Sequence, residues 1–263
     1  MKTIQEMAAL TPEQRKAPYA AFYDRPAPVI PPECLQIIEH GSDMDPADAI
    51  TDLNISAMLH PDRIKVENGY CILPDGTGYV AARHVMPGVT FDMYKFWLGW
   101  WKAEDHDTRY KIWCPGKHTA AFYTYTSEEI GGKLEEIYFG NSITHDPRLI
   151  SLDPDEMSRS VCVMADGGNA MSKTYGAPPE EPPMCGVVCH FIYEEPGVPG
   201  ITMRSRFWQG CQALGGHIVP LRAPGQRVEL ERLHGLFEHN CLEMNGLGDL
   251  LPGLYRQQVL ESE

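Results

Sequence analysis

The sequence predicts an α+β fold in which a run of antiparallel strands is followed by one long closing helix. The first observation behind this prediction is the order of the patterns, with strand-like segments over residues 69–208 and a helical pattern after them. The second is the composition, 43% hydrophobic and 22% charged, which is ordinary for a globular protein. The length of 263 residues suits one large domain with an appendage.

The first 65 residues are rich in proline, alanine and acidic residues and have few large apolar side chains. Asp45 followed by Pro46 predicts the start of a short helix. A second short helix is expected over residues 52–59, before Pro61. Residues 1–65 are therefore interpreted as an arm that packs on the main domain, residues 66–263, or on a second subunit.

The main domain opens with a predicted hairpin. Residues 69–73 and 78–83 read as strands, and the turn between them contains Pro74 and Gly76. An apolar and aromatic helix is expected over residues 90–101. The strands expected after it are residues 109–114, 118–126, 133–139, 160–164, 185–193 and 200–208.

The chain closes with a predicted amphipathic helix over residues 226–245, with Gly246 just past its end at a favourable stop position. This order of elements fits the helix-grip arrangement of START and birch-pollen-allergen domains, in which a curved antiparallel sheet wraps around a long C-terminal helix. Such an arrangement leaves a cavity between sheet and helix, where ligand sites tend to lie.

Charge and hydropathy exclude several classes of partner. The net charge of −14 argues against nucleic acid or an anionic membrane, because both favour clustered lysine and arginine. The longest apolar run, near residues 96–101, is too short to cross a membrane. Lys2 and Glu6 interrupt the apolar N-terminus, which therefore does not resemble a signal peptide. We expect a cytoplasmic protein.

The eight cysteines form no C-x-x-C pair, so reduced buried thiols are expected. The sequence also contains no G-x-S-x-G, no glycine-rich phosphate loop and no H-E-x-x-H. The main support for several common enzyme classes is therefore missing.

His234 and Glu238 lie four residues apart on the closing helix, beside an apolar stripe. An imidazole and a carboxylate one turn apart can bind one divalent ion. The alternative is a partly exposed pair on the flank of the helix. The same stretch is one residue too long for the H-x-x-E-H motif, which counts against a peptidase.

Three further segments carry candidate residues. His118 follows a turn and faces the closing helix if it begins a strand inside the cavity; otherwise it is a solvated turn histidine. Glu128 and Glu129 are adjacent, so one can enter the cavity while the other is solvated, or both are solvated at a hairpin end. His190 lies in an apolar strand, either as a hydrogen-bonded core residue or as a catalyst.

Taken together, several segments resemble the family of phloretin hydrolase and 2,4-diacetylphloroglucinol hydrolase. The similarity runs in order from about residue 10 to the C-terminus, and residues 17–23 look closer to the phloretin branch. The segments that carry the resemblance are residues 67–81, 110–118, 128–132, 203–208 and 234–238.

The resemblance implies a zinc-dependent enzyme that cleaves the carbon–carbon bond between a phloroglucinol ring and its acyl group. The family's metal is held by two histidines and two glutamates, which fall here on His118, Glu128, His234 and Glu238. Glu129 remains an alternative, because the segment after His118 is shorter than in the family. The resemblance also implies that Tyr110 contacts a substrate oxygen and that His190 transfers a proton. It further implies a homodimer built partly by the arm.

The chemistry would need a proton donor, an electrophile and an activated water. The ring can leave because it tautomerises at the carbon that bears the acyl group, and zinc supplies the electrophile and the activated water. The expected partner is a small aromatic ketone, with phloretin, giving phloroglucinol and 3-(4-hydroxyphenyl)propanoate, as first choice. The alternatives are a non-enzymatic helix-grip carrier of aromatic ligands and a hydrolase of diacetylphloroglucinol or another β-diketone.

Overall fold

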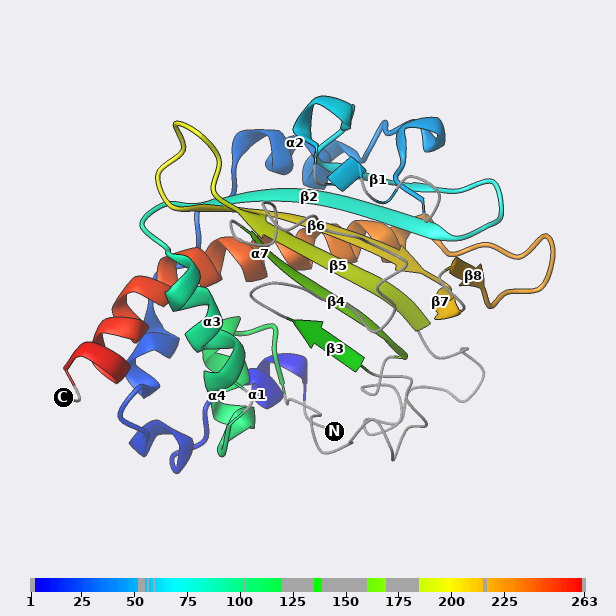
Figure 1. Cartoon of the computed structure of the whole chain (residues 1–263). Coiled ribbons are helices and arrows are strands. Elements are labelled where there is room, and N and C mark those ends of the chain that lie inside the picture. Colours follow the sequence, from blue (N-terminus) through cyan, green and yellow to red (C-terminus); the bar gives the residue numbers. More distant parts are fainter. Residues whose placement is uncertain are drawn as a thin grey trace.

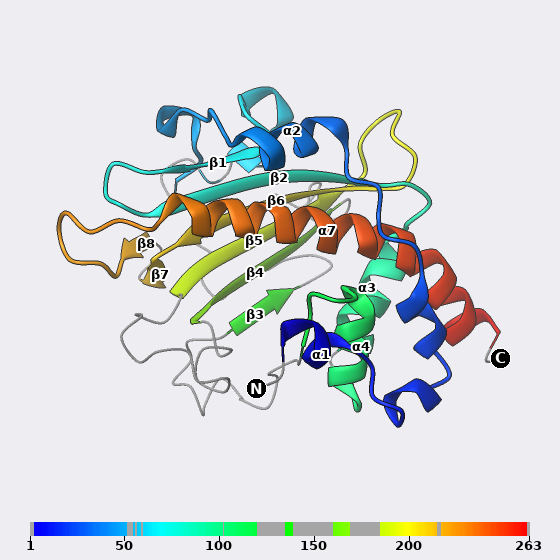
Figure 2. The same ribbon diagram turned by 180° about the vertical axis from the view of Figure 1, so that it is seen from behind.

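The protein is an α+β structure in which a long helix lies across one face of an antiparallel sheet (Figures 1 and 2). This computed structural model describes residues 3–51, 55, 57–58, 60–101, 103–119, 135–138, 160–168, 185–214 and 217–261. None of the helices within these ranges is both long and apolar enough to cross a membrane.

The main sheet has six strands in the order β1-β2-β6-β5-β4-β3, and each neighbouring pair is antiparallel. A separate pair, β7 with β8, follows β6. The strands are β1 (Gly69–Ile72), β2 (Gly78–Met86), β3 (Glu135–Tyr138), β4 (Ser160–Gly168), β5 (Cys185–Tyr193), β6 (Ile201–Gln209), β7 (Cys211–Leu214) and β8 (His217–Pro220).

The predicted opening hairpin is confirmed. The Leu73 amide donates to the Thr77 carbonyl at 2.8 Å, and Gly76 has a φ of +87°, which suits glycine at a tight turn. The predicted strands over residues 133–139, 160–164, 185–193 and 200–208 correspond to β3, β4, β5 and β6. The one expected over residues 118–126 lies almost wholly outside the described residues.

The strand predicted over residues 109–114 is wrong, because this segment belongs to helix α4 (His106–Trp113). Thr108, Lys111 and Ile112 are buried, and their spacing of three and four is the helical one. The preceding helix, α3 (Phe91–Trp100), is confirmed, and the Thr90 hydroxyl accepts a hydrogen bond from the Met93 amide at its start.

The closing helix α7 (Leu230–Tyr255) is longer at its C-terminal end than predicted, and Gly246 lies inside it. The helix continues because the next turns carry Leu247, Leu251 and Leu254, all fully buried against α3 and the sheet. The apolar burial of these turns outweighs the weak helix propensity of one glycine.

Alternate residues of β2 define the two faces of the sheet. Val80 and Ala82 pack with Leu233 and Phe237 of α7, whereas Tyr79 belongs to the apolar cluster on the opposite face. Helix and sheet approach closely at Gly78, where an added Cβ would lie 2.4 Å from the Leu233 side chain.

The face of the sheet away from α7 is covered by part of the arm. Met44, Ile50 and Met58 pack there with Tyr79 and Trp208, and the Trp208 indole donates to the Ile50 carbonyl at 2.8 Å. In Figure 2 the blue N-terminal chain crosses α7 and leads to α2, beside β1 and β2. The arm's elements are α1 (Ile4–Ala8), η1 (Gln14–Lys16), η2 (Ala20–Asp24), α2 (Pro32–His40), η3 (Pro46–Asp48) and η5 (Pro61–Arg63).

The predicted helix start at Asp45 is confirmed as a single 3₁₀ turn, in which the Asp45 carboxylate accepts from the Ala47 amide at 2.9 Å. The helix predicted over residues 52–59 falls largely outside the described residues. The chain ends in a short π-helix, η6 (Arg256–Leu260), continuous with α7.

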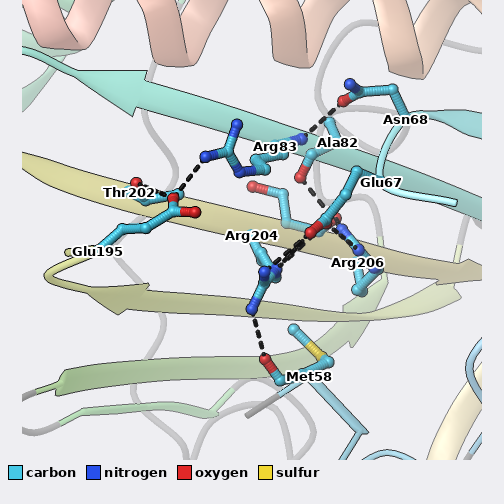
Figure 3. Close-up of polar contacts among 10 residues, drawn as sticks. Met58, Glu67, Asn68, Ala82, Arg83, Glu195, Thr202, Arg204 and Arg206 are labelled. Atoms are coloured by element: carbon cyan, nitrogen blue, oxygen red, sulfur yellow. Dashed lines mark hydrogen bonds and ion pairs between the residues drawn. The ribbon is translucent and has the colours of Figure 1, made fainter. Parts of the chain in front are cut away.

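Three charged side chains form a network on this same face: Glu67, just after the arm, and Arg204 and Arg206 of β6 (Figure 3). Glu67 accepts from both Arg204, at 2.8 Å, and Arg206, at 2.9 Å. The two guanidinium groups are 1% and 0% exposed, so one carboxylate balances two buried cations. Arg204 also donates to the Met58 carbonyl at 3.1 Å, which fixes the arm to β6.

The six cysteines whose side chains the structure describes are all free and buried. For these residues the prediction of reduced thiols is confirmed.

Candidate metal centre

The turn after α4 carries His118 into the interior. The Cys114 carbonyl accepts from the backbone amides of Lys117, at 3.2 Å, and His118, at 3.0 Å, and Gly116 takes a φ of +77°. The His118 side chain is 2% exposed and stacks on the Tyr110 ring, with centroids 3.7 Å apart and planes 9° apart. Its Nδ1 lies 2.9 Å from the Tyr110 carbonyl oxygen.

Helix α7 presents His239 and Glu243, one turn apart, to this histidine. The His118 Nε2 atom lies 3.3 Å from His239 Nε2 and 3.2 Å from Glu243 Oε1, and the last two atoms are 4.0 Å apart. Three potential metal-ligand atoms from two distant segments therefore meet at one point. Glu243 and His239 are 11% and 33% exposed, so the point lies inside the protein.

The proton positions explain what this point can hold. A carbonyl oxygen only accepts, so the His118 Nδ1 carries hydrogen and donates to Tyr110, which leaves a lone pair on Nε2 when the ring is neutral. That lone pair faces a carboxylate oxygen and a second imidazole nitrogen. A proton on Nε2 would satisfy one of these contacts, whereas a divalent cation satisfies all three.

The ionisation of Glu243 agrees with this arrangement. Burial raises the pKa of this carboxyl, but the hydrogen bond with His118 and the charge of His239 offset that effect, and the net pKa is lowered. Glu243 is therefore an anion at neutral pH, as a metal-binding carboxylate must be.

Cys114 lies next to the same group. Its Sγ and ligand atoms of His118 and His239 all lie within 4.8 Å of one another, so these three residues could also hold a metal ion. Burial and the nearby Glu243 carboxylate raise the pKa of the Cys114 thiol to about 12. Without a metal, Cys114 is therefore a neutral thiol at neutral pH, and it is the weakest metal ligand among these residues.

The structure does not bring His234 together with His118. The Nε2 atom of His234 lies 2.9 Å from the Ile38 carbonyl, which only accepts, so this nitrogen carries hydrogen and is not free to bind a metal. Five residues along an α-helix correspond to a turn of about 140°, so His234 and His239 leave different sides of α7. The assignment of His234 as a metal ligand therefore stays a prediction, and this geometry does not support it.

Glu238 is more exposed to solvent than expected for a metal ligand inside the cavity. Its side chain is 38% exposed, and its Oε1 lies 3.7 Å from the Lys117 ammonium. The sequence contains two consecutive H-x-x-x-E pairs, 234 with 238 and 239 with 243, and the structure brings the second pair to His118.

Of the remaining site residues predicted from the sequence, the structure describes Tyr110 and His190 but not the two glutamates. Glu128 and Glu129 lie outside the described residues. Tyr110 is at the site through its stacked ring and its carbonyl contact with His118. His190, on β5, lies 2.8 Å from the Ser205 hydroxyl through Nδ1, and its ring meets Phe207 edge-on at 5.7 Å.

A second buried histidine was missed in the sequence. His84 of β2 is 0% exposed, and its Nε2 lies 2.8 Å from Asn240 Oδ1 on α7. Burial lowers the pKa of both His84 and His190 to about 4, and the charge of Glu243 raises it in both cases, so the three groups lie near one another. The sequence did carry a signal for His84: it is a polar residue at an inward-facing position of the apolar strand β2.

Comparisons with known proteins point to one family. A family model described as the DAPG hydrolase PhiG domain matches residues 50–256. A 2,4-diacetylphloroglucinol hydrolase of Pseudomonas sp is 28% identical over an alignment of 277 positions that covers 92% of this chain and 89% of that protein. A phloretin hydrolase of Eubacterium ramulus is 25% identical over an alignment of 285 positions that covers 98% of this chain and 96% of that protein.

Proposed function

The chain belongs to the family of DAPG hydrolase PhiG domains, and on this premise we propose that it is a zinc-dependent hydrolase. The bond it would cleave joins a phloroglucinol ring to its acyl group. The single observation that carries the proposal is the meeting of His118, His239 and Glu243 at one buried point. Histidine nitrogens and carboxylate oxygens are the ligand types that catalytic zinc sites use.

The proposed ligands are thus His118, His239 and Glu243, with a further glutamate as the fourth. Glu128 and Glu129 remain the sequence-based choices for it. Zinc content of the glutamine variants at positions 128 and 129 would decide between them.

A bound zinc ion would supply an electrophile for the acyl carbonyl and activate a water as nucleophile. The chain's own residues would supply orientation and the proton. His118 is held by the Tyr110 backbone and ring, so its Nε2 keeps one direction. Tyr110 would accordingly support the ligand histidine as well as contact a substrate oxygen.

His190 would transfer the proton to the ring carbon that loses the acyl group. Its low pKa keeps the imidazole neutral at pH 7, so it would act as a hydrogen-bonded relay rather than as a permanently charged acid. Ser205, 2.8 Å from Nδ1, fixes the ring and leaves Nε2 for the substrate.

The proposed substrate class is the acylphloroglucinols, with phloretin as first choice. Support comes from relatives named for phloretin and for 2,4-diacetylphloroglucinol, at 25% and 28% identity. The helix-grip assignment, the homodimer and the cytoplasmic location stay predictions.

Turnover of zinc-loaded protein with phloretin, 2,4-diacetylphloroglucinol and a phenyl ketone without ring hydroxyls tests the proposal. Release of phloroglucinol from phloretin, with no cleavage of the phenyl ketone, is the expected result, because only the hydroxylated ring can tautomerise. A protein that binds phloretin but releases no phloroglucinol would instead be a carrier.

A further inference from the structure

One buried donor next to the candidate metal centre has no partner within the described part of the chain. The side-chain amide nitrogen of Asn240, Nδ2, is buried and makes no hydrogen bond there. Asn240 is 0% exposed and lies on α7 between His239 and Glu243. An unpaired buried amide donor costs about 1–3 kcal/mol, so its position calls for a partner that binds later.

The orientation of this amide follows from a chain of hydrogen bonds. The Cys241 carbonyl only accepts, so the group of Asn245 at 2.7 Å from it is the donor Nδ2. The same Nδ2 lies 3.4 Å from His84 Nδ1, which makes Nδ1 the acceptor and places the hydrogen of His84 on Nε2. The His84 Nε2–H then donates to Asn240 Oδ1 at 2.8 Å.

Asn240 is therefore held with its oxygen toward His84 and its NH₂ group turned away from it. Residues three apart on a helix are neighbours on its surface, so Asn240 and Glu243 share one flank of α7. The Asn240 amide and the candidate metal ligand Glu243 therefore face the same part of the interior.

We propose that the Nδ2 amide of Asn240 donates a hydrogen bond to the acyl oxygen of the substrate, and that His84 is the residue that positions this amide. The proposal rests on the proposed function for the identity of the substrate. When a water oxygen bonds to the acyl carbon, the carbonyl π pair moves onto the acyl oxygen. A fixed neutral N–H donor stabilises the negative charge that develops there without needing to reorient.

Two substitutions of Asn240 remove the donor in different ways. Asn240→Asp keeps an oxygen for His84 but has no N–H, and Asn240→Ala removes the group without adding charge. Both should keep stoichiometric zinc and the wild-type fold, while kcat on phloretin falls about 100-fold and KM changes by less than about threefold. Loss of zinc, or a kcat within about threefold of wild type, would overturn the proposal.

The positioning role of His84 has its own pair of variants. Glutamine can still donate to Asn240 Oδ1, whereas leucine cannot and leaves the amide free to rotate. His84→Leu should lower kcat at least about tenfold at unchanged zinc content, and His84→Gln should recover most of it. Equal losses in both variants would contradict the positioning role.

A binding measurement separates this proposal from the proposed function. Acetohydroxamate presents carbonyl-type oxygens to a metal and undergoes no cleavage here. Calorimetric titration of the zinc-loaded protein should show affinity about tenfold weaker in Asn240→Ala than in wild type. If the wild-type protein cleaves no acylphloroglucinol but the affinity difference is found, the proposed function is wrong and the donor role of Asn240 is supported. If Asn240→Ala binds acetohydroxamate as tightly as wild type, the donor role is wrong.

Discussion

At the scale of single residues, burial lowers the pKa of two histidines, His84 and His190, that lie near the Glu243 carboxylate. His84 is fully buried and has a pKa of about 4, against about 6.5 for a solvated histidine. The cause is desolvation, which opposes the charged imidazolium, and the hydrogen bond to Asn240 only partly offsets it.

This depressed pKa makes a prediction for stability. Between about pH 6.5 and pH 4 the unfolded chain binds a proton at His84 that the folded protein excludes, so the free energy of unfolding falls as the pH is lowered. From pH 7 to pH 5 the contribution of His84 is about 1–2 kcal/mol. Urea unfolding of wild type and His84→Gln at the two pH values measures it.

The variant should be less stable at pH 7 but should lose less stability on acidification. A decrease of the same size in wild type and His84→Gln would show that this histidine does not titrate with folding. The metal-free form of both proteins is the matched pair, because zinc release at low pH adds a pH dependence of its own.

At the scale of elements, α7 is the part of the molecule where sequence and structure differ most. Gly246 was interpreted as a helix stop, yet it lies inside α7, where an added Cβ would meet Arg25 at 3.4 Å and Pro28 at 3.7 Å. These are ordinary contact distances, and a helical backbone accepts alanine without strain. Pattern alone could not show this, because the burial of the following turns comes from α3 and the sheet.

Gly246→Ala should therefore stabilise the protein by up to about 1 kcal/mol through helix propensity. If Gly246 were instead the left-handed residue that ends the helix, the same change would destabilise by about 1 kcal/mol. Urea unfolding gives the sign. Gly78→Ala is the matched control, and it should destabilise, since its Cβ would lie 2.4 Å from Leu233.

Other elements were predictable for identifiable reasons. The β1–β2 hairpin follows from local turn chemistry at Gly76, and β5 and β6 follow from long apolar runs with turn signals between them. The strand expected at residues 109–114 failed because aromatic and aliphatic residues suit both strands and helices. Tertiary packing decided in favour of α4.

The choice of site residues also depended on tertiary packing. Spacing predicted that the closing helix supplies a histidine and a glutamate, and the family resemblance implied His118 as their partner. The prediction selected His234 and Glu238 and did not consider the next pair, His239 and Glu243, because the choice depends on which side of α7 faces α4. The Ile38 carbonyl that binds His234 is 196 residues away in the sequence.

At the scale of the whole molecule, buried charges tie the end of the arm and the residues just after it to the sheet, through Glu67 and through the Arg204 contact with the Met58 carbonyl. Glu67 is the acceptor shared by Arg204 and Arg206, and removing it leaves two nearly fully buried cations without this partner. Breaking a buried ion pair from one side costs about 3–5 kcal/mol. The network therefore couples the fold of the arm to the stability of the sheet.

Glu67→Ala should lower the free energy of unfolding by about 3 kcal/mol or more. Glu195→Ala is the matched control, because its partner Arg83 is 27% exposed and can be hydrated; it should cost about 1 kcal/mol. Chemical unfolding of both variants measures the difference. Equal small losses would mean that the Glu67 network does not hold the arm in place.

The central claim is that His118, His239 and Glu243 hold the metal, and zinc content per chain tests it most directly. After dialysis against a weak chelator, wild type, His234→Ala, Glu238→Gln and Cys114→Ser should keep about one zinc per chain. His239→Ala and Glu243→Gln should keep less than about one fifth of that amount, because each removes a ligand. Retention of zinc by His239→Ala together with its loss from His234→Ala would contradict the claim.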